Sequence, residues 1–314
     1  MSGPGHPPVP GGQTNPWRRL LWKRFFGSPL LGRRLFGRGG EGVALAPLDP
    51  DAGPVYAVGD IHGCRSLLAG LEEVIRADAA AFPGRPRIVL LGDMIDRGPD
   101  VAGLIDDILR PLPWGERLAI RGNHEAMMLA FLADPQRRGD WLTHGGYETL
   151  RSYGLALDPA GLARLSGRRL GQMLAAHLPE SHLAWLRALP HGFFLPMAET
   201  TWVLAHAGQD PARVLADQPP DVLIWGQPPG QTSGRTEGHG QGTPPRRLVH
   251  GHVIRDEVDL SAQDIGVDTG AWRTGRLSAL RLVPGHPAQL LVQAGAAVPS
   301  ALGPPIVSTG ISAQ

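Results

Sequence analysis

Residues 55–63 read Val-Tyr-Ala-Val-Gly-Asp-Ile-His-Gly, a short apolar run that ends in a polar cluster. The pattern recurs at Ile88–Leu91, before Gly-Asp-Met-Ile-Asp-Arg-Gly, and at Leu118–Ile120, before Arg-Gly-Asn-His-Glu. Short apolar runs bounded by such clusters are typical of buried strands, and the segments after them have helical spacing. The predicted helices are Ser66–Ala81, Val101–Leu109 and Glu125–Leu132. This β-α-β-α-β order predicts an α/β fold.

The rest of the chain extends this body. Residues 141–190 have helical spacing with Pro179 and Pro190 as stops. Further strands are predicted at Trp202–Ala205, Leu248–His250, Ile265–Val267 and Leu277–Leu282. Residues 226–245 hold six Gly and four Pro, which predicts a loop. We therefore expect a basic, Gly/Pro-rich flexible arm over residues 1–40, one folded domain over residues 41–283, and an irregular, uncharged tail over residues 284–314.

The composition hides an asymmetry in charge. The chain has 30 Lys and Arg against 29 Asp and Glu, a net charge of +1, but residues 1–40 contain seven basic residues and no acidic one. The remaining residues therefore carry a net charge of −6. The arm could contact a membrane, nucleic acid or a protein partner, or be a solvated linker, and these alternatives stay open.

Composition also excludes several classes of protein. A hydrophobic fraction of 42% excludes wholesale disorder, and the single cysteine, Cys64, has no partner for an internal disulfide. No apolar run approaches the ~20 residues that a membrane-spanning helix needs. We therefore expect a cytoplasmic protein, with no prediction of its oligomeric state.

The polar clusters bring metal-binding residue types to one edge. The first three lie roughly thirty residues apart, which is the length of a β-α unit, and strand ends of an open α/β sheet are where ligands bind. Two histidines end later strands. The candidates are Asp60, His62, Asp93, Asn123, His206 and His252. Carboxylate, imidazole and amide oxygen suit a divalent ion such as Mn²⁺ or Fe, and the absence of cysteine ligands argues against a structural zinc site.

In this order, Gly-Asp-Ile-His-Gly, Gly-Asp-Met-Ile-Asp-Arg-Gly, Gly-Asn-His-Glu, a later His-Ala-Gly and a later Gly-His resemble the motifs of the calcineurin-like metallophosphoesterases. The resemblance is to the phosphoprotein phosphatase branch, which includes serine/threonine protein phosphatases, phage lambda phosphatase and symmetrical dinucleoside tetraphosphatases. Residues 145–154 and 266–280 are similar to its small bacterial protein-phosphatase-type members. The resemblance covers residues 54–283. It implies two mixed β-sheets packed as a sandwich flanked by helices, with a metal site at the C-terminal strand ends.

The resemblance also implies the ligands and the nucleophile. It implies two divalent metal ions, Mn²⁺ first and iron or zinc as alternatives, with a hydroxide bridging them as the nucleophile. The implied ligands are Asp60 and His62 for the first ion, Asp93 as the bridge, and Asn123, His206 and His252 for the second ion. His250 competes with His252 for the last place, and the family pattern favours His252.

Three further residues are implied to act on the phosphoryl group. His124 would protonate the leaving oxygen as general acid, oriented by Asp96, and Arg97 would bind the non-bridging oxygens. Family members usually place a second arginine after a Leu-Trp pair, where this chain has Gly226.

Two arginines are weaker candidates for substrate contact. Arg235, in the predicted loop, could replace the missing arginine, and Arg121 lies at a strand end beside the predicted site. Cys64 is expected to be a packing residue. The histidines outside the motifs are assigned to surface or packing roles, namely His144, His182, His191 and His239. Trp141 and Trp225 are expected to be core residues and not platforms for substrate.

These implications predict a two-metal phosphatase acting on phosphorylated protein Ser/Thr or on similar small phosphoesters. The alternative in the same class is a symmetrical dinucleoside tetraphosphate hydrolase. The alternative from another class is a non-catalytic scaffold that binds membrane or nucleic acid through its basic arm.

Overall fold

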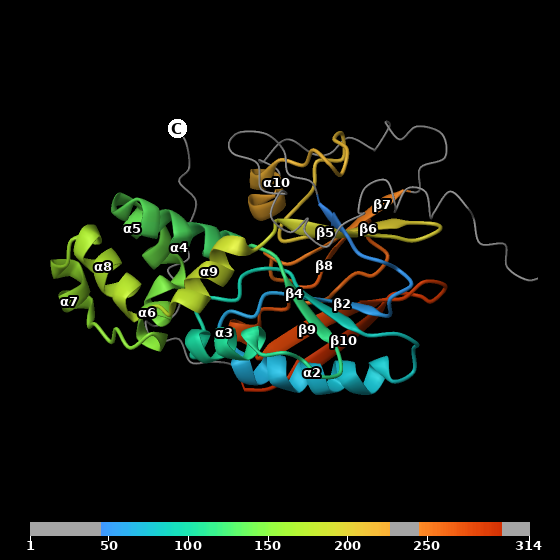
Figure 1. Cartoon of the computed structure of the whole chain (residues 1–314), viewed down its shortest axis with the longest axis horizontal. Coiled ribbons are helices and arrows are strands. Elements are labelled where there is room, and N and C mark those ends of the chain that lie inside the picture. Colours follow the sequence, from blue (N-terminus) through green and yellow to red (C-terminus); the bar gives the residue numbers. More distant parts are fainter. Residues whose placement is uncertain (1–44, 227–244, 297–314) are drawn as a thin grey trace, which may run out of the picture. The chain divides into compact units, whose positions relative to one another are not determined.

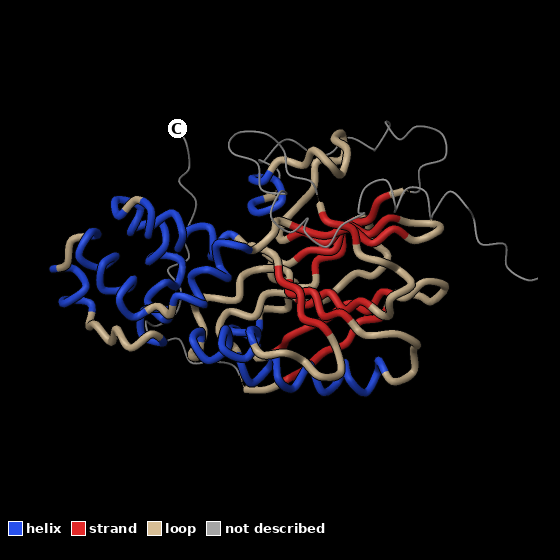
Figure 2. The backbone as a smooth tube through the Cα atoms, in the orientation of Figure 1, coloured by secondary structure: helices blue, strands red, loops and turns tan. Residues whose placement is uncertain are grey.

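Two five-stranded β-sheets stack at the centre of the fold, and Figure 2 shows them as two layers of strands. The computed structural model describes residues 45–226 and 245–296, which all belong to one compact unit spanning residues 42–314. The predicted arm over residues 1–40 and most of the predicted loop over residues 226–245 lie outside the described residues.

The first sheet contains the strands of the three leading motifs. β2, β3 and β4 are parallel, β9 pairs with β2 in the antiparallel direction, and β10 does the same with β9. In spatial order the strands are β10 (Gln289–Ala294), β9 (Arg276–Leu282), β2 (Val55–Val58), β3 (Arg87–Leu90) and β4 (Glu116–Ala119).

The second sheet is also mixed. β1 is parallel to β5, β5 is antiparallel to β6, and β6, β7 and β8 are parallel. In spatial order the strands are β1 (Ala46–Pro47), β5 (Gly192–Pro196), β6 (Thr201–Ala205), β7 (Arg246–His250) and β8 (Asp264–Gly266). The predicted pair of mixed sheets is therefore confirmed.

Alternation along the strands builds the layers. Val55 and Ala57 of β2 belong to the apolar cluster between the two sheets, whereas Tyr56 and Val58 belong to the cluster shared with the helices. All four side chains are fully buried, because both faces of the sheet are covered. This explains why β2 is a continuous apolar run in the sequence.

Helices lie on the outer faces of the two sheets and at one end of them. They are α2 (Arg65–Ala79), α3 (Val101–Leu109), α4 (Asn123–Ala133), α5 (Arg138–Trp141), α6 (Tyr147–Ser152), α7 (Pro159–Arg164), α8 (Gly167–His177), α9 (Glu180–Ala188), α10 (Pro220–Trp225) and α11 (Ala271–Thr274), with a 3₁₀ turn at Pro135–Arg137 and a π-helical segment at Leu142–Gly146. In α2 the stripe of Leu67, Leu71 and Ile75 is buried under the first sheet. α10 buries Leu223 against the second. Helices α4 to α9 gather at one end of the sheets, at the left of Figure 1.

The leading β-α-β-α-β order is confirmed, and β2 and α3 have the predicted bounds. The prediction of an irregular tail over residues 284–314 is wrong for Gln289–Ala294, which form β10 beside β9. β10 is an edge strand with Leu291 as its one buried residue, so it leaves little apolar pattern in the sequence. The folded body therefore extends past residue 283. β5 was also not predicted from the sequence.

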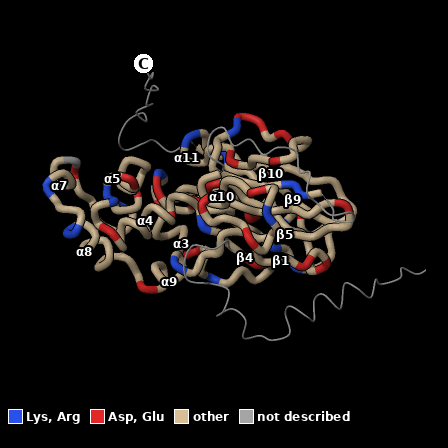
Figure 3. The backbone as a smooth tube through the Cα atoms, turned by 90° about the horizontal axis from the view of Figure 1, so that it is seen from above, with Lys and Arg blue, Asp and Glu red and all other residues tan. Residues whose placement is uncertain are grey.

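Acidic and basic residues are interspersed along the described part of the chain (Figure 3). None of the described helices is both long and apolar enough to cross a membrane.

Candidate functional site

The candidate metal ligands come from the C-terminal ends of five strands. Asp60 and His62 follow β2, Asp93 follows β3, and Asn123 begins α4 after β4. From the second sheet, His206 follows β6 and His252 follows β7. The stacking of the two sheets therefore brings together residues that are as much as 192 positions apart, such as His252 and Asp60.

The backbone at this site is strained. Among the described residues, every non-glycine residue with a positive φ belongs to the candidate site: His62 (47°), Asp93 (52°), Asp96 (70°), Arg97 (64°) and His252 (66°). Each such conformation disfavours an L side chain and persists only where the surrounding structure imposes it. Strain confined to one cluster points to function at that cluster.

Two glycines let the backbone approach the carboxylates. A Cβ atom at Gly122 would lie 2.2 Å from Asp93 Oδ1, and one at Gly251 would lie 2.0 Å from Asp60 Oδ1. Both distances are far below van der Waals contact. These positions therefore require glycine because of the site.

Backbone carbonyls fix the orientation of two histidines. His62 Nδ1 donates to the Ile95 carbonyl at 2.8 Å, and His206 Nδ1 donates to the Leu91 carbonyl at 2.8 Å. The Nε2 atom of each ring therefore faces Asp93 Oδ2, at 3.7 Å from His62 and 3.5 Å from His206. This arrangement of one anchored nitrogen and one inward nitrogen is typical of metal-binding histidines.

The Asn123 amide joins the two histidines of the second sheet. Its Oδ1 lies 2.8 Å from His206 Nε2 and 3.0 Å from His252 Nδ1. The His252 backbone N–H donates to the Asp60 carboxylate at 3.1 Å. By contrast, the His250 ring packs against Gly266 and its Nδ1 lies 2.8 Å from the Gly251 carbonyl. The structure thus directs His252, and not His250, toward the cluster.

Three buried carboxylates crowd the site. Burial, with Asp268 and Asp93 nearby, raises the pKa of Asp60 well above its usual value. Burial and Asp93 raise the pKa of Asp268 to about 6. Asp268 had no role in the sequence prediction, although it lies in the quoted stretch 266–280, and it was recognisable there only as part of the resemblance.

The histidines of the cluster are held neutral. Burial lowers the pKa of His62 well below its usual value, that of His206 to about 3 and that of His252 to about 4. A divalent cation requires neutral imidazoles, and its positive charge would favour the ionised form of the crowded carboxylates, which burial and mutual repulsion disfavour. The donor set therefore fits the metal ions that the sequence implied.

His124 is built into a separate network at the same edge. Its Nδ1 lies 2.7 Å from Asp96 Oδ2, and the same carboxylate accepts from Trp141 Nε1 at 3.0 Å and from Thr149 Oγ1 at 2.5 Å. Asp96 and Trp141 are fully buried. Trp141 was predicted to be only a core residue. It packs in the core, stacked on Phe131, and also orients Asp96.

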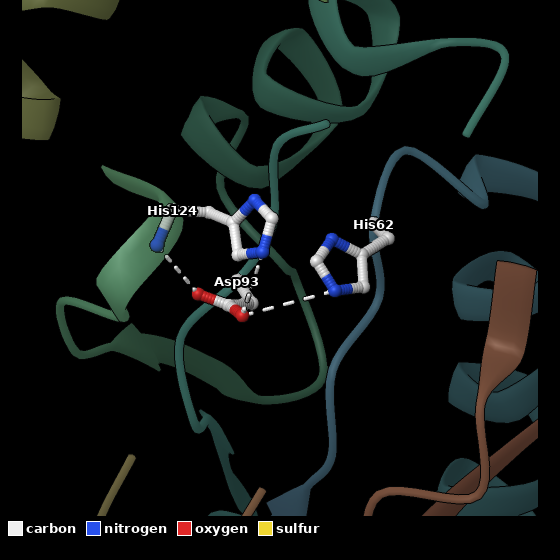
Figure 4. Close-up of side chains that lie close together, drawn as sticks. All are labelled: His62, Asp93 and His124. Atoms are coloured by element: carbon white, nitrogen blue, oxygen red, sulfur yellow. Dashed lines mark hydrogen bonds and ion pairs between the residues drawn. The ribbon is translucent and has the colours of Figure 1, made fainter. Parts of the chain in front are cut away.

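His124 and His62 approach Asp93 from two sides, as Figure 4 shows. The His124 backbone N–H donates to Asp93 Oδ1 at 3.0 Å, and its Nε2 lies 3.8 Å from Asp93 Oδ2. Within residues 45–226 and 245–296, two sets of side chains lie close enough together to hold an ion. One set is His62, Asp93 and His124, and the other is Asp93, His206 and His252. His124 is thus either a third ligand or, since its Nδ1 is bound by Asp96, a proton donor through Nε2.

Glu125 organises the backbone around Asp93. Its fully buried carboxylate accepts the N–H groups of Asp93, Met94, Ile95 and Gly122 at 2.8 to 3.2 Å. Glu125 belongs to the Gly-Asn-His-Glu motif, but no role for it was predicted from the sequence. Gly122 is the N-cap residue of α4, and Glu125 follows it by three positions, which is the spacing of a capping glutamate. This spacing is the sequence feature that could have revealed the role of Glu125.

The structure separates the predicted substrate arginines. Arg97 lies at the site, with Nη1 3.0 Å from His62 Nε2. The Arg121 guanidinium instead donates to the carbonyl of Arg187, at the C-terminal end of α9, so we no longer assign it to substrate. Arg235 lies outside the described residues. Gly226 has φ 79° and ψ −175°, a backbone that an arginine would rarely adopt.

A sandwich whose strand ends gather carboxylates, neutral imidazoles and an amide oxygen has the donor set of a protein that binds divalent metal ions. Residues 53–254 match the calcineurin-like phosphoesterase family, and the chain belongs to that family.

Two relatives in sequence are named as serine/threonine-protein phosphatases. The chain is 27% identical over 235 residues to serine/threonine-protein phosphatase 2 of Escherichia coli (strain K12), an alignment that covers 73% of this chain and 92% of that protein. It is 44% identical over 92 residues to serine/threonine-protein phosphatase 1 of Salmonella typhimurium, covering 29% of this chain and only 38% of that protein. A crystal structure of a candidate diadenosine tetraphosphatase is similar with a TM-score of 0.51 and 25% identity, over 80% of this chain and 98% of that one.

Proposed function

We propose that this protein is a two-metal phosphatase that hydrolyses phosphomonoesters of the phosphoserine and phosphothreonine type. The observation that carries the proposal is the convergence of one donor set from five strand ends, where all the non-glycine residues with positive φ in the described part of the chain also lie. The ligands we assign are Asp60, His62, Asp93, Asn123, His206 and His252. Their mixture of oxygen and imidazole donors favours Mn²⁺, with iron and zinc as alternatives.

When bound, two divalent ions supply Lewis-acid activation of water and charge neutralisation at the phosphoryl group. Residues of the chain bind the phosphoryl group and donate the proton to the leaving oxygen. We assign Arg97 to the non-bridging phosphoryl oxygens, because its planar fork lies beside His62 and matches their geometry. We assign His124 as the general acid, with the transferable proton on Nε2, because Asp96 occupies Nδ1.

Asp96 controls the state of this acid. Burial lowers the pKa of His124 to about 4, which disfavours the protonated ring. Burial also raises the pKa of Asp96 to about 8, so its carboxyl retains a proton at pH 7. Transfer of that proton across the 2.7 Å contact to His124 Nδ1 gives the imidazolium that a general acid needs, beside a carboxylate that stabilises it. Trp141 and Thr149 hold that carboxylate in place through their own hydrogen bonds.

The experiment that tests the proposal is a substrate panel with purified full-length protein and Mn²⁺. We expect turnover of para-nitrophenyl phosphate and of a phosphoserine peptide, and loss of both in Asp93→Asn. Turnover that vanishes in Asp93→Asn would also dispose of the non-catalytic scaffold as an alternative. An inactive wild-type protein with two bound ions would contradict the proposal.

A dinucleoside tetraphosphatase is the second candidate, favoured by the similarity to the candidate diadenosine tetraphosphatase structure. The same panel should therefore include diadenosine tetraphosphate. A clear preference for the dinucleotide would select this candidate over the protein phosphatase. We also expect the enzyme to act in the cytoplasm, which cell fractionation tests.

The assignment of His124 needs its own measurement. His124→Asn should lower kcat while leaving the metal content at two ions per chain, measured by elemental analysis. Loss of an ion from this variant would make His124 a ligand, as the geometry of His62, Asp93 and His124 also allows.

A further inference from the structure

Arg97 is held between two parts of the chain. On one side, its backbone N–H donates to the Gly145 carbonyl at 3.1 Å and its Nε donates to the His144 carbonyl at 3.4 Å. A Cβ atom at Gly145, which has φ 105°, would lie 2.7 Å from Arg97 Cγ. On the other side, the guanidinium carbon lies 5.3 Å from the centre of the Trp272 ring. The distance is within the ~6 Å limit of a cation–π contact.

The turn that carries Trp272 is fixed by its own hydrogen bonds. The Gly270 N–H donates to Asp268 Oδ1 at 2.8 Å, and Thr274 Oγ1 donates to the Thr269 carbonyl at 2.7 Å. Thr269 Oγ1 in turn lies 2.8 Å from Ser278 Oγ of β9. The short helix α11 is therefore anchored to the first sheet, and the indole is presented from a rigid support.

The choice of an indole at this position is not explained by packing. Trp272 is half-buried against the helical core, and its Nε1 is buried with no hydrogen-bond partner among the described residues. An unpaired buried donor is unfavourable, and a phenylalanine would fill apolar space without it. What tryptophan adds is the strongest attraction of the aromatic side chains for a cation over its face.

We propose that Trp272 is a positioning residue for the phosphate clamp, acting on the phosphoryl group through Arg97. The inference rests on the proposed function, because a clamp has a role only if the site binds a phosphoryl group. Trp272 keeps the guanidinium beside His62, where its fork can receive two phosphoryl oxygens. Without the ring, the 144–145 segment and the contact with His62 Nε2 still hold Arg97, but nothing covers the face of the guanidinium, and the side chain samples orientations that cannot bind phosphate.

The test combines two substitutions of Trp272 with a matched control. Trp272→Leu should weaken competitive inhibition by inorganic phosphate and raise KM for para-nitrophenyl phosphate by about 2- to 30-fold, the range of a cation–π contact converted at 1.4 kcal/mol per tenfold. Trp272→Phe keeps an aromatic face and should restore most of the loss. Trp114→Leu removes another half-buried indole from the same core and should leave both constants unchanged.

A double-mutant cycle separates positioning from packing. In an Arg97→Ala background, Trp272→Leu should cause no further loss of phosphate affinity, because the residue it positions is gone. The unfolding free energies of the same four proteins, measured without metal, should be non-additive, since the two side chains touch. Additive losses of phosphate affinity, whatever the unfolding free energies show, or a Trp272→Phe variant as weak as Trp272→Leu, would overturn the inference.

The outcomes distinguish the two proposals. Turnover by the wild-type protein with an additive cycle would overturn the role of Trp272 alone. Absence of wild-type turnover would overturn the proposed function and, with it, the role given to Trp272.

Discussion

Asp96→Asn is expected to make the metal-free protein more stable and the enzyme much less active. The side chain is fully buried, and burial raises the pKa of Asp96 from 3.8 to about 8. At pH 7 the unfolded chain ionises this group freely while the folded chain resists it. With about 1.4 kcal/mol for each unit of pKa, the buried acid costs up to about 4 kcal/mol at that pH.

The asparagine fits the same hydrogen bonds. Its amide oxygen can accept from His124 Nδ1 and Trp141 Nε1, as the carboxylate does. Its amide nitrogen then faces Thr149 Oγ1, a hydroxyl that can turn and accept instead of donating. Thr149 Oγ1 already accepts the backbone N–H of residue 96 at 3.0 Å, so its own hydrogen and the second N–H of the asparagine amide would lose their acceptors, and only part of the gain should be realised.

The pH dependence gives the sign of the effect. Because the folded-state pKa lies above the unfolded one, the destabilising contribution is absent below about pH 4, grows as the pH rises, and is complete above about pH 8. The advantage of Asp96→Asn should therefore shrink steadily as the pH is lowered from 7 toward 4. Urea unfolding of the metal-free protein at several pH values measures it.

The catalytic activity of Asp96→Asn should fall, although its stability rises. A neutral amide cannot stabilise the His124 imidazolium, so kcat should fall by about 10²–10⁴-fold, the usual contribution of a general acid. Asp51→Asn, at an exposed position, is the control and should change neither quantity. A destabilised Asp96→Asn variant at pH 7, or an advantage that does not depend on pH, would refute the reasoning.

Three further perturbations test the remaining parts of the site. Gly251→Ala should displace the Asp60 carboxylate, since the new Cβ lies 2.0 Å from its Oδ1, and elemental analysis should find fewer than two ions per chain. Gly139→Ala is the matched control, because a Cβ there meets nothing within 4 Å. Full metal content in Gly251→Ala would contradict the prediction. Glu125→Gln should destabilise the fold by about 2–4 kcal/mol in urea unfolding, because its partners are backbone N–H groups that cannot become acceptors; an unchanged stability would show that the four bonds are dispensable. Deletion of residues 1–40 should leave turnover of para-nitrophenyl phosphate intact and change location or partner choice, whereas loss of turnover would place the arm in the fold.

Only part of the site was accessible from sequence. The candidate ligands follow predicted strands, and Asp, His and Asn are residue types that bind divalent metal ions. The set of ligands could therefore be predicted from the sequence without the structure. Arg121 shows where this reasoning fails, because proximity in sequence to Asn123 does not decide where a long side chain points. Its guanidinium meets the end of α9 instead, more than sixty residues away in the chain.

The network around Asp96 was also beyond the sequence. Trp141 and Thr149 lie 45 and 53 residues from Asp96, and nothing local marks either as its partner. Trp272 and Arg97 are farther apart still, and their contact depends on the antiparallel return of β9 onto β2. Contacts between side chains so far apart in the sequence depend on how the helices and strands pack against one another.

The sequence by itself determined the strand-and-helix order of the first half, the metal-binding residue types and the end of each strand at which they lie, because strand period, glycine turns and ligand chemistry are local properties. The tertiary structure decided which strands share a sheet, that Gln289–Ala294 joins one of them, and which side chains support His124 and Arg97. The physical reason is that these pairings are selected by burial of apolar faces across the sandwich, which no short stretch of sequence contains.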